Sequence, residues 1–170
     1  IADYYHIFSP SIREHFFKKT NKSLEKSIII VDEAHNLPKR IRDLLTFKLS
    51  TLTLQRALKE ARPYPEIEEK ISNLQNLILS LKTDEEENLV KKGDFQFDPE
   101  LIAELEIVAD EIREIKKHSY IGSVANFLKA WLGPDEGYAR IFKKSLYKGN
   151  EISSLIYSCL DPSVATKEIV

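Results

Sequence analysis

The fold class of this chain is decided by residues 28–37, which read IIIVDEAHNL. The first part is a short run of β-branched apolar residues, and such a run predicts a strand buried on both faces of a parallel sheet. The run ends abruptly at Asp32, where acidic and polar residues begin. In open α/β sheets ligands bind just beyond the carboxyl ends of the strands, so we expect a functional site at this end of the segment.

Asp32 and Glu33 point to nucleotide chemistry, because the chain turns here and both carboxylates can reach one cavity. In nucleotide-hydrolysing motors an Asp at this place holds the Mg²⁺ of a nucleoside triphosphate, and a neighbouring Glu can orient or deprotonate the attacking water. The chain has no Gly-x-x-x-x-Gly-Lys-Ser/Thr loop, and its five glycines form no such cluster. The sequence therefore carries half of a nucleotide site, and a piece of a larger enzyme is favoured over an ordinary strand with an acidic turn.

The composition excludes several classes of protein. A net charge of -2 gives no general attraction to nucleic acid, so any DNA contact must come from local patches. No apolar stretch is long enough to cross a bilayer, which argues against a membrane partner. The single cysteine, Cys159, excludes an internal disulfide framework and a cysteine-only iron–sulphur or zinc site, and fits a reducing compartment. We interpret the start at Ile1, without an initiator Met, as the boundary of an excised segment.

The predicted elements divide the chain into a sheet fragment and a helical middle. Strands over residues 2–8 and 27–31, joined by a helix from Pro10 to about Lys19, make one βαβ unit at the edge of a truncated α/β domain. Residues 66–81 and 99–117 are helices with matching apolar seams, so we expect them to pack antiparallel as a spine. Residues 83–98 between them are expected to form a polar loop that is mobile or shaped for contact. The other predicted elements are a strand over residues 47–50, helices over 51–62 and 123–132, a β-hairpin with strands 138–147 and 151–160, and a last helix from Ser163.

The predicted fold class is therefore mixed α/β, mainly α: the edge of a parallel-sheet motor domain with an inserted helical lobe that ends in a β-hairpin. Residues 1–38 would belong to the motor domain, residues 39–156 would form the inserted lobe, and residues 157–170 would return to the motor domain. The change in hydrophobic period after Lys39 motivates the first boundary.

Three segments resemble the XPD family of superfamily 2 DNA helicases. They are DEAHNL at residues 32–37, ADYYHIFSPSIR at residues 2–13 and SCLDPS at residues 158–163. In that family the DEAH box is followed by a helical insertion, the Arch, which ends in a segment similar to SCLDPS. DinG-type helicases share the DEAH box and are the alternative.

The resemblance implies that the parent protein is an ATP-dependent 5′-to-3′ DNA helicase of nucleotide excision repair. Asp32 would bind the Mg²⁺ of Mg-ATP, Glu33 would activate the hydrolytic water, and His35 would couple the nucleotide state to DNA contacts. A 4Fe–4S cluster is implied in the parent protein but not in this segment. The implied partners are single-stranded DNA, the remaining helicase and iron–sulphur domains, and repair or transcription-complex proteins such as TFIIH, in a prokaryotic cytoplasm or a eukaryotic nucleus.

Basic residues offer candidate DNA contacts. The best cluster is interleaved with Tyr138, Phe142 and Tyr147, an arrangement typical of single-strand binding. The alternative is that the basic residues form an ordinary solvated surface, with the aromatic residues on the buried face of the hairpin. For the function, a helical protein-docking module remains the alternative. The candidates in the best cluster are Arg140, Lys143, Lys144 and Lys148; two further clusters are Lys18, Lys19 and Lys22, and Lys39, Arg40 and Arg42.

Overall fold

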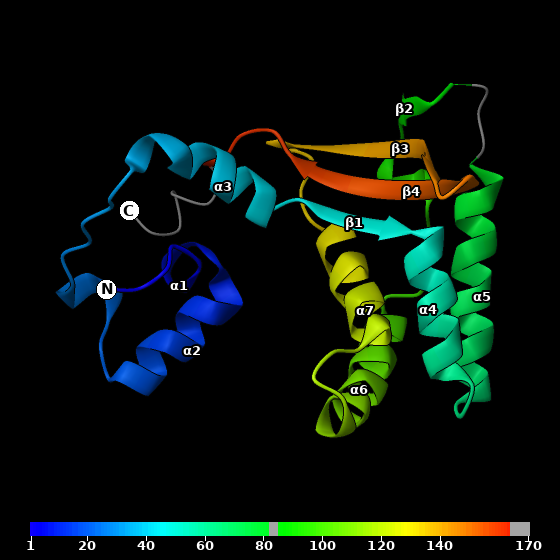
Figure 1. Ribbon diagram of the computed structural model, residues 1–170, viewed down its shortest axis with the longest axis horizontal. Helices are drawn as coiled ribbons and strands as arrows, with labels where there is room; N and C mark the ends of the chain where they lie inside the picture. Colours follow the sequence, from blue (N-terminus) through cyan, green and yellow to red (C-terminus); the bar gives the residue numbers. More distant parts are fainter. Residues whose placement is uncertain (82–84, 164–170) are drawn as a thin grey trace. The chain divides into compact units, whose positions relative to one another are not determined.

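The computed structural model describes residues 1–81 and 85–163, and these form two compact units (Figure 1). The first unit contains residues 1–46, residues 136–138 and the segment from residue 158 onward. The second contains residues 47–135 and 139–157. In the described part of the chain, no helix has the length and apolar character needed to span a membrane.

The first unit consists of short helices around a small core. Phe8 and Ile41 are buried at the centre of this core, and Tyr4, Ile7, Leu37, Leu44 and Leu45 pack against them. Pro10 is in the first turn of α2, where its missing N–H costs no hydrogen bond. The helices are α1 (Tyr5–Phe8), α2 (Pro10–Thr20) and α3 (Leu37–Leu44), with 3₁₀ turns at Leu24–Lys26 and Ala34–Asn36.

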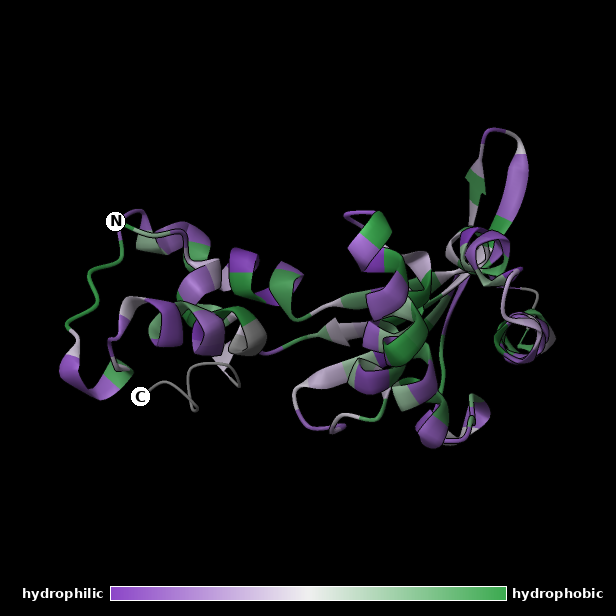
Figure 2. Cartoon of the chain, turned by 90° about the horizontal axis from the view of Figure 1, so that it is seen from below, coloured by the Kyte–Doolittle hydropathy of each residue, from purple (hydrophilic) through white to green (hydrophobic). Residues whose placement is uncertain are grey.

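The two strands predicted for this unit, over residues 2–8 and 27–31, do not form. Residues 2–8 contain helix α1, and residues 27–31 form no strand. Ile28, Ile29, Ile30 and Val31 are 95, 39, 90 and 38% exposed, and this alternation is that of an extended segment without a sheet. In Figure 2 this apolar run is an irregular segment that belongs to no helix or strand. A buried parallel strand needs neighbouring strands for its hydrogen bonds, and among the described residues no strand of the first unit pairs with this run.

The second unit has a four-stranded sheet in the order β1-β4-β3-β2. Strand β1 (Phe47–Ser50) pairs antiparallel with β4 (Asn150–Cys159), and β2 (Glu87–Leu89) pairs antiparallel with β3 (Tyr138–Tyr147). The predicted hairpin is confirmed. Its turn residues Lys148 and Gly149 have φ values of 50° and 80°, as a two-residue type I′ turn requires.

Four helices cover one face of this sheet (Figure 1): α4 (Thr51–Ala61), α5 (Pro65–Ser80), α6 (Glu100–Ile115) and α7 (Tyr120–Trp131). Ser50 and Ser119 cap α4 and α7, since their side chains accept the N–H groups of Thr53 and Gly122. The core between the helices and the sheet includes Leu49, Leu54, Ile71, Leu105, Phe127, Trp131 and Leu155, all fully or almost fully buried.

The predicted α5–α6 spine is wrong. Helix α5 packs mainly on α4, α6 packs mainly on α7, and α4 packs on α7. Helices α5 and α6 meet over a short stretch that includes the Lys70–Glu104 ion pair. Ile71 and Ile112 are buried as expected, but an apolar seam specifies only that a helix needs a partner, not which helix it is.

The described part of the segment between α5 and α6, residues 85–98, contains regular structure where the sequence predicted a polar loop. It contains β2, a 3₁₀ turn at Lys92–Asp94, and Phe95, which is buried against Trp131 with 5.6 Å between ring centroids. The backbone carbonyl oxygen of Phe95 accepts a hydrogen bond from the indole N–H of Trp131 at 3.2 Å. Of the helix predicted from Ser163, all but that first residue lies outside the described residues.

Candidate functional site

The DEAH residues form a tight turn directly after the exposed apolar run. Glu33 has φ 52° and ψ 40°, a left-handed conformation that costs a non-glycine residue about 1–2 kcal/mol. Local hydrogen bonds hold the turn: Asp32 Oδ1 accepts the N–H of Glu33 at 2.9 Å, and the carbonyl of Glu33 accepts the N–H of Asn36 at 3.0 Å. The turn thus places two adjacent carboxylates at the point where the extended segment ends.

His35 links the turn through both ring nitrogens. Its Nδ1 lies 3.2 Å from Glu33 Oε2, and its Nε2 lies 3.0 Å from Asn36 Nδ2. Because an amide NH₂ can only donate, the pair of contacts fits a ring that carries its proton on Nδ1 and donates it to Glu33. Asn36 is a partner that our sequence reasoning missed, although its position directly after His35 was a usable signal.

The turn fits one side of a Mg-nucleotide site. Mg²⁺ in such sites is held by one or two carboxylates together with phosphate oxygens and water, and Asp32 is an exposed carboxylate of this kind. Among the described residues there is no group of three or more His, Cys, Asp or Glu side chains that could hold a metal by themselves. Any Mg²⁺ at Asp32 therefore needs the phosphates of the nucleotide as its other ligands.

An iron–sulphur cluster does not fit this segment. Such clusters need several thiolates, whereas Cys159 is the only cysteine and is buried. Burial raises the pKa of the Cys159 thiol, and this disfavours the thiolate form that binds metals.

Residues 158–163 lie against the helix that follows the DEAH turn. Thr46 Oγ1 accepts the N–H of Cys159 at 3.1 Å and donates to the carbonyl of Arg42 at 2.8 Å. Pro162 and Ser163 line an apolar hollow of about 270 Å³ together with Ala34, Leu37, Pro38 and Ile41. Two of the segments that carried the resemblance, DEAHNL and SCLDPS, are thus neighbours in the first unit.

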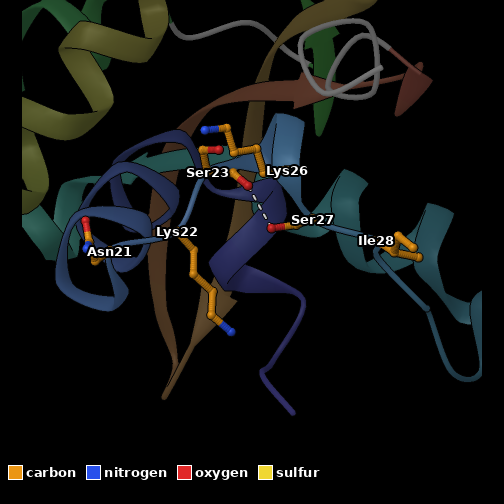
Figure 3. Close-up of a pocket in the computed structure, with 6 residues that line it drawn as sticks. All are labelled: Asn21, Lys22, Ser23, Lys26, Ser27 and Ile28. Atoms are coloured by element: carbon orange, nitrogen blue, oxygen red, sulfur yellow. Dashed lines mark hydrogen bonds between the residues drawn. The ribbon is translucent and has the colours of Figure 1, made fainter.

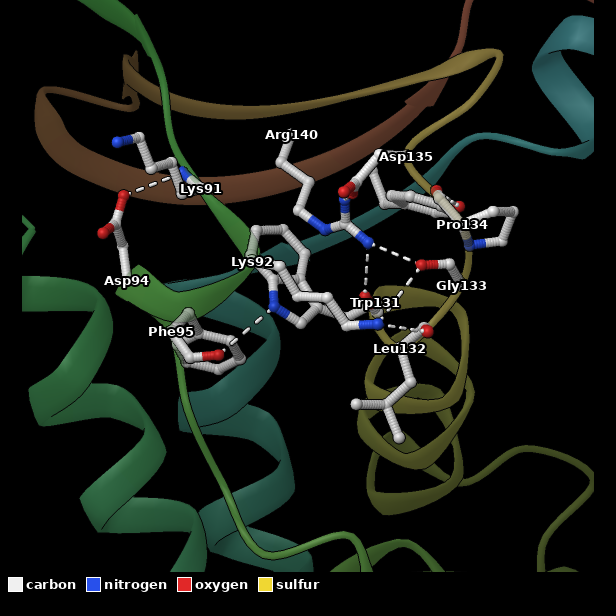
Figure 4. Close-up of polar contacts among 11 residues, drawn as sticks. Lys91, Lys92, Asp94, Phe95, Trp131, Leu132, Gly133, Pro134, Asp135 and Arg140 are labelled. Carbon is white, nitrogen blue, oxygen red and sulfur yellow. Dashed lines mark hydrogen bonds and ion pairs between the residues drawn. The ribbon is translucent and has the colours of Figure 1, made fainter.

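Arg140 does not belong to a DNA-binding surface, which corrects the expectation for this residue. Its side chain is 4% exposed and forms an ion pair with Asp135 (Figure 4). Nη2 donates to the carbonyls of Trp131 and Gly133, both at 2.8 Å, and the guanidinium lies 4.8 Å from the Tyr157 ring centroid. The Arg140 guanidinium thus binds the free carbonyl groups at the C-terminal end of α7, where a positive charge is favourable. Phe142 is also buried, so the aromatic residue next to Arg140 belongs to the core.

The other cations of this cluster lie toward the exposed end of the hairpin. Lys143 donates to Glu87 Oε2 of the neighbouring strand at 2.5 Å, and this hydrogen bond raises the pKa of Lys143. Lys148 is in the exposed turn, with its Nζ 5.6 Å from the centroid of the Tyr147 ring. Lys144 is half-buried. In the first unit, Arg40 stacks over Tyr4 at 5.2 Å, so this member of the third cluster has a partner within the unit.

Comparisons with known proteins agree with the resemblance inferred from the sequence. Residues 1–54 match the family model named DEAD_2. A solved structure titled "XPD_APO" matches 98% of this chain with a TM-score of 0.67 and 23% identity, and a second titled "XPD_Helicase" matches 98% with a TM-score of 0.69 and 22% identity. At these identities the structural matches establish the fold. The chain spans only 31% and 28% of the length of those two proteins.

Proposed function

Because residues 1–54 carry the DEAD_2 sequence pattern and the chain has the fold of an XPD helicase segment, we propose that it is part of an ATP-dependent DNA helicase. In this proposal the first unit supplies one side of the Mg-ATP site. The second unit is the Arch, which helps to guide single-stranded DNA. The parent helicase would move 5′ to 3′ and act in nucleotide excision repair.

The observation that carries the proposal is the exposed run 28–31 directly before the DEAH turn. Burying the four β-branched side chains of this run stabilises by roughly 1.5–3 kcal/mol for each residue that becomes fully buried, so the run has a strong preference for a covered environment. Strands of a motor domain on both sides would cover it and supply its backbone hydrogen bonds. The carboxylates of Asp32 and Glu33 would then stand at the carboxyl edge of that sheet, where nucleotides bind in open α/β folds.

Each residue of the turn has a specific role in this proposal. Asp32 would hold the Mg²⁺ of the bound nucleotide. Glu33 orients the attacking water and accepts its proton at a carboxylate oxygen. His35, which contacts that carboxylate in the structure, keeps Glu33 in position and would relay a change at the nucleotide to the rest of the turn. Bound Mg-ATP supplies the phosphoryl chemistry itself.

The proposed role of the second unit in DNA guidance now rests on Lys143, Lys144 and Lys148. With Arg140 removed from the cluster, these lysines lie on the outer half of β3 and in the turn that follows. Tyr147 is 49% exposed beside Lys148, and an exposed aromatic ring next to a cation can stack on a base. A 4Fe–4S domain elsewhere in the parent protein would complete the path for the strand.

A hollow between α5 and the start of α6 favours a second candidate function, protein docking. It has a volume of about 190 Å³, and Leu74, Leu77, Phe97 and Leu101 form its apolar part. The Lys70–Glu104 ion pair lies at its rim. A hollow of this size fits one bulky apolar side chain of a repair or transcription-complex protein. Both functions can belong to the same unit, because the hollow and the hairpin turn use different residues.

The proposed function is tested by replacing Glu33 in the full-length protein. Glu33→Gln keeps the size of the side chain and removes the base, so DNA-stimulated ATP hydrolysis should fall by about 10²–10⁴-fold while binding of a fluorescent ATP analogue is retained. Glu25→Gln is the matched control, since Glu25 is an exposed carboxylate in the same unit outside the turn. Near-normal hydrolysis by Glu33→Gln would contradict the role assigned to Glu33.

A further inference from the structure

A polar hollow of about 640 Å³ lies at the connection between α2 and the apolar run, away from the DEAH turn in the sequence. Its lining residues are Asn21, Lys22, Ser23, Lys26, Ser27 and Ile28 (Figure 3). Two cations and no carboxylate line it, so its electrostatic preference is for an anion. We refer to it below as the Lys22–Lys26 hollow.

The backbone of this connection is fixed by its own hydrogen bonds. Asn21 is left-handed, with φ 51°, and ends α2. Lys22 N–H then donates to the carbonyl of Phe17 at 3.1 Å, and Ser27 Oγ donates to the carbonyl of Ser23 at 2.7 Å. The positions from which the two lysines project are therefore set by the fold rather than by an ion pair.

The two ammonium groups are not used inside the chain. Within the described residues neither the Lys22 nor the Lys26 ammonium group has a hydrogen-bond or ion-pair partner. By contrast, Lys70 and Lys143 are each paired with a glutamate. Two unpaired ammonium groups beside a hollow without carboxylates are available to an external ligand.

The directions of the side chains distinguish between anions. In Figure 3 Lys22 and Lys26 leave the connection in different directions, and their amino groups do not converge on one point. A single phosphate ion would need converging donors, whereas a chain of phosphates can contact one lysine after the other. We propose that the Lys22–Lys26 hollow is a binding site for successive backbone phosphates of single-stranded nucleic acid. This inference rests on the proposed helicase function and adds a DNA contact in the first unit, separate from the hairpin of the second.

The test uses the full-length protein and a double variant, Lys22→Gln with Lys26→Gln. The matched control is Lys116→Gln with Lys117→Gln, which removes the same charge from exposed residues outside the hollow. Binding of a fluorescent oligothymidine is measured by anisotropy between low and moderate salt. Two lost phosphate contacts should reduce the slope of log K against log salt by about 1.4, since each contact to a single strand contributes roughly 0.7. The control should keep the wild-type slope, and equal losses in both variants would overturn the site.

A second measurement separates failure of this site from failure of the proposed function. Lysine reactivity toward reductive methylation is read by mass spectrometry with oligothymidine, inorganic phosphate or no ligand. Protection of Lys22 and Lys26 by the oligonucleotide but not by phosphate supports the proposal. Equal protection by inorganic phosphate, or no protection in a protein that still binds DNA, overturns it. A wild-type protein that binds no DNA at all refutes the proposed function, and this site with it.

Discussion

The guanidinium of Arg140 lies 5.2 Å from the centroid of the Trp131 ring and donates a hydrogen bond to the carbonyl oxygen of the same residue at 2.8 Å. Lys92 reinforces this end of α7, because its Nζ donates to the carbonyl of Leu132 at 2.6 Å (Figure 4). Two cations from distant parts of the sequence thus satisfy helix carbonyls that have no partner within α7. The cluster ties β3 and the segment before α6 to one helix end.

Arg140→Ala should destabilise the second unit strongly. It removes a buried cation and leaves the Trp131 and Gly133 carbonyls with fewer donors, at an expected cost on the order of 2–4 kcal/mol. Urea unfolding of the chain followed by the fluorescence of Trp131, the only tryptophan, measures this. Lys143→Ala, which breaks only an exposed ion pair, should cost less than about 1 kcal/mol. Equal midpoints for Arg140→Ala and the wild type would exclude the structural role.

Burial along α6 gives a matched pair of charge insertions. Ile112 is 9% exposed and Ile115 is 87% exposed on the same helix. Ile112→Asp should unfold the second unit because it places an unpaired charge in the core, whereas Ile115→Asp should change stability by less than about 0.5 kcal/mol. Circular dichroism and thermal melts of the two variants make the comparison. Similar melting curves for both would mean that the α6 seam does not face the core.

The chain by itself should not hydrolyse ATP. Asp32 and Glu33 can hold Mg²⁺ and water, but the sequence has no phosphate-binding loop to position the β- and γ-phosphates. Release of inorganic phosphate from ATP, with and without single-stranded DNA, should stay at the level of the buffer. DNA-stimulated release that disappears in Glu33→Gln would refute this expectation.

Cys159 should react slowly with alkylating reagents in the folded chain. Burial raises the pKa of its thiol, so at pH 8 the thiolate fraction is smaller than that of a free cysteine, and the reactive species appears only as the pH rises further. Iodoacetamide labelling followed by mass spectrometry should therefore be slow at pH 8 and faster at pH 9.5. Labelling in urea should be fast at both pH values. Fast labelling of the native chain at pH 8 would contradict the buried position.

The hairpin lysines should affect unwinding more than nucleotide binding. In the full-length protein, Lys143→Gln with Lys144→Gln is expected to lower the unwinding rate of a forked duplex and leave ATP-analogue affinity unchanged. Lys116→Gln with Lys117→Gln is the control, because it removes the same charge from the exposed region after α6. If the hairpin variant unwinds as fast as this control, Lys143 and Lys144 are only a solvated face.

Local sequence signals predicted the second unit well. The apolar period of residues 66–81 and the Lys148-Gly149 turn each depend on neighbours in sequence, and α5 and the hairpin formed as expected. Helix pairing was not predictable in the same way, because the seams of α5 and α6 are compatible with several partners. Ser119 begins α7 earlier than expected, since its hydroxyl accepts the N–H of Gly122.

The first unit was harder to predict for a different reason. The strand signal of residues 28–31 is strong, but a strand forms only when a neighbouring strand accepts and donates its hydrogen bonds. Among the described residues this run has no such neighbour, and its side chains are exposed. At the candidate site, the DEAH motif identified the residues, while the left-handed Glu33 and the Asn36–His35–Glu33 chain of contacts depend on backbone geometry that the motif does not encode. The burial of Arg140 was missed because a basic residue next to aromatic residues has the same sequence pattern in a core and on a surface.

The pairing of Phe47 with Tyr157 joins the first residue of β1 to a residue near the end of β4, and the Thr46–Cys159 hydrogen bond lies just outside that pair. Two of the chain connections between the units, at residues 46–47 and 157–158, therefore leave from the same end of one antiparallel ladder. A mechanical load applied through these connections would peel β1 from β4 one hydrogen bond at a time, beginning at Thr46 and Cys159. Such a ladder resists pulling far less than one loaded along its strands, so the second unit would open first at this end under such a load.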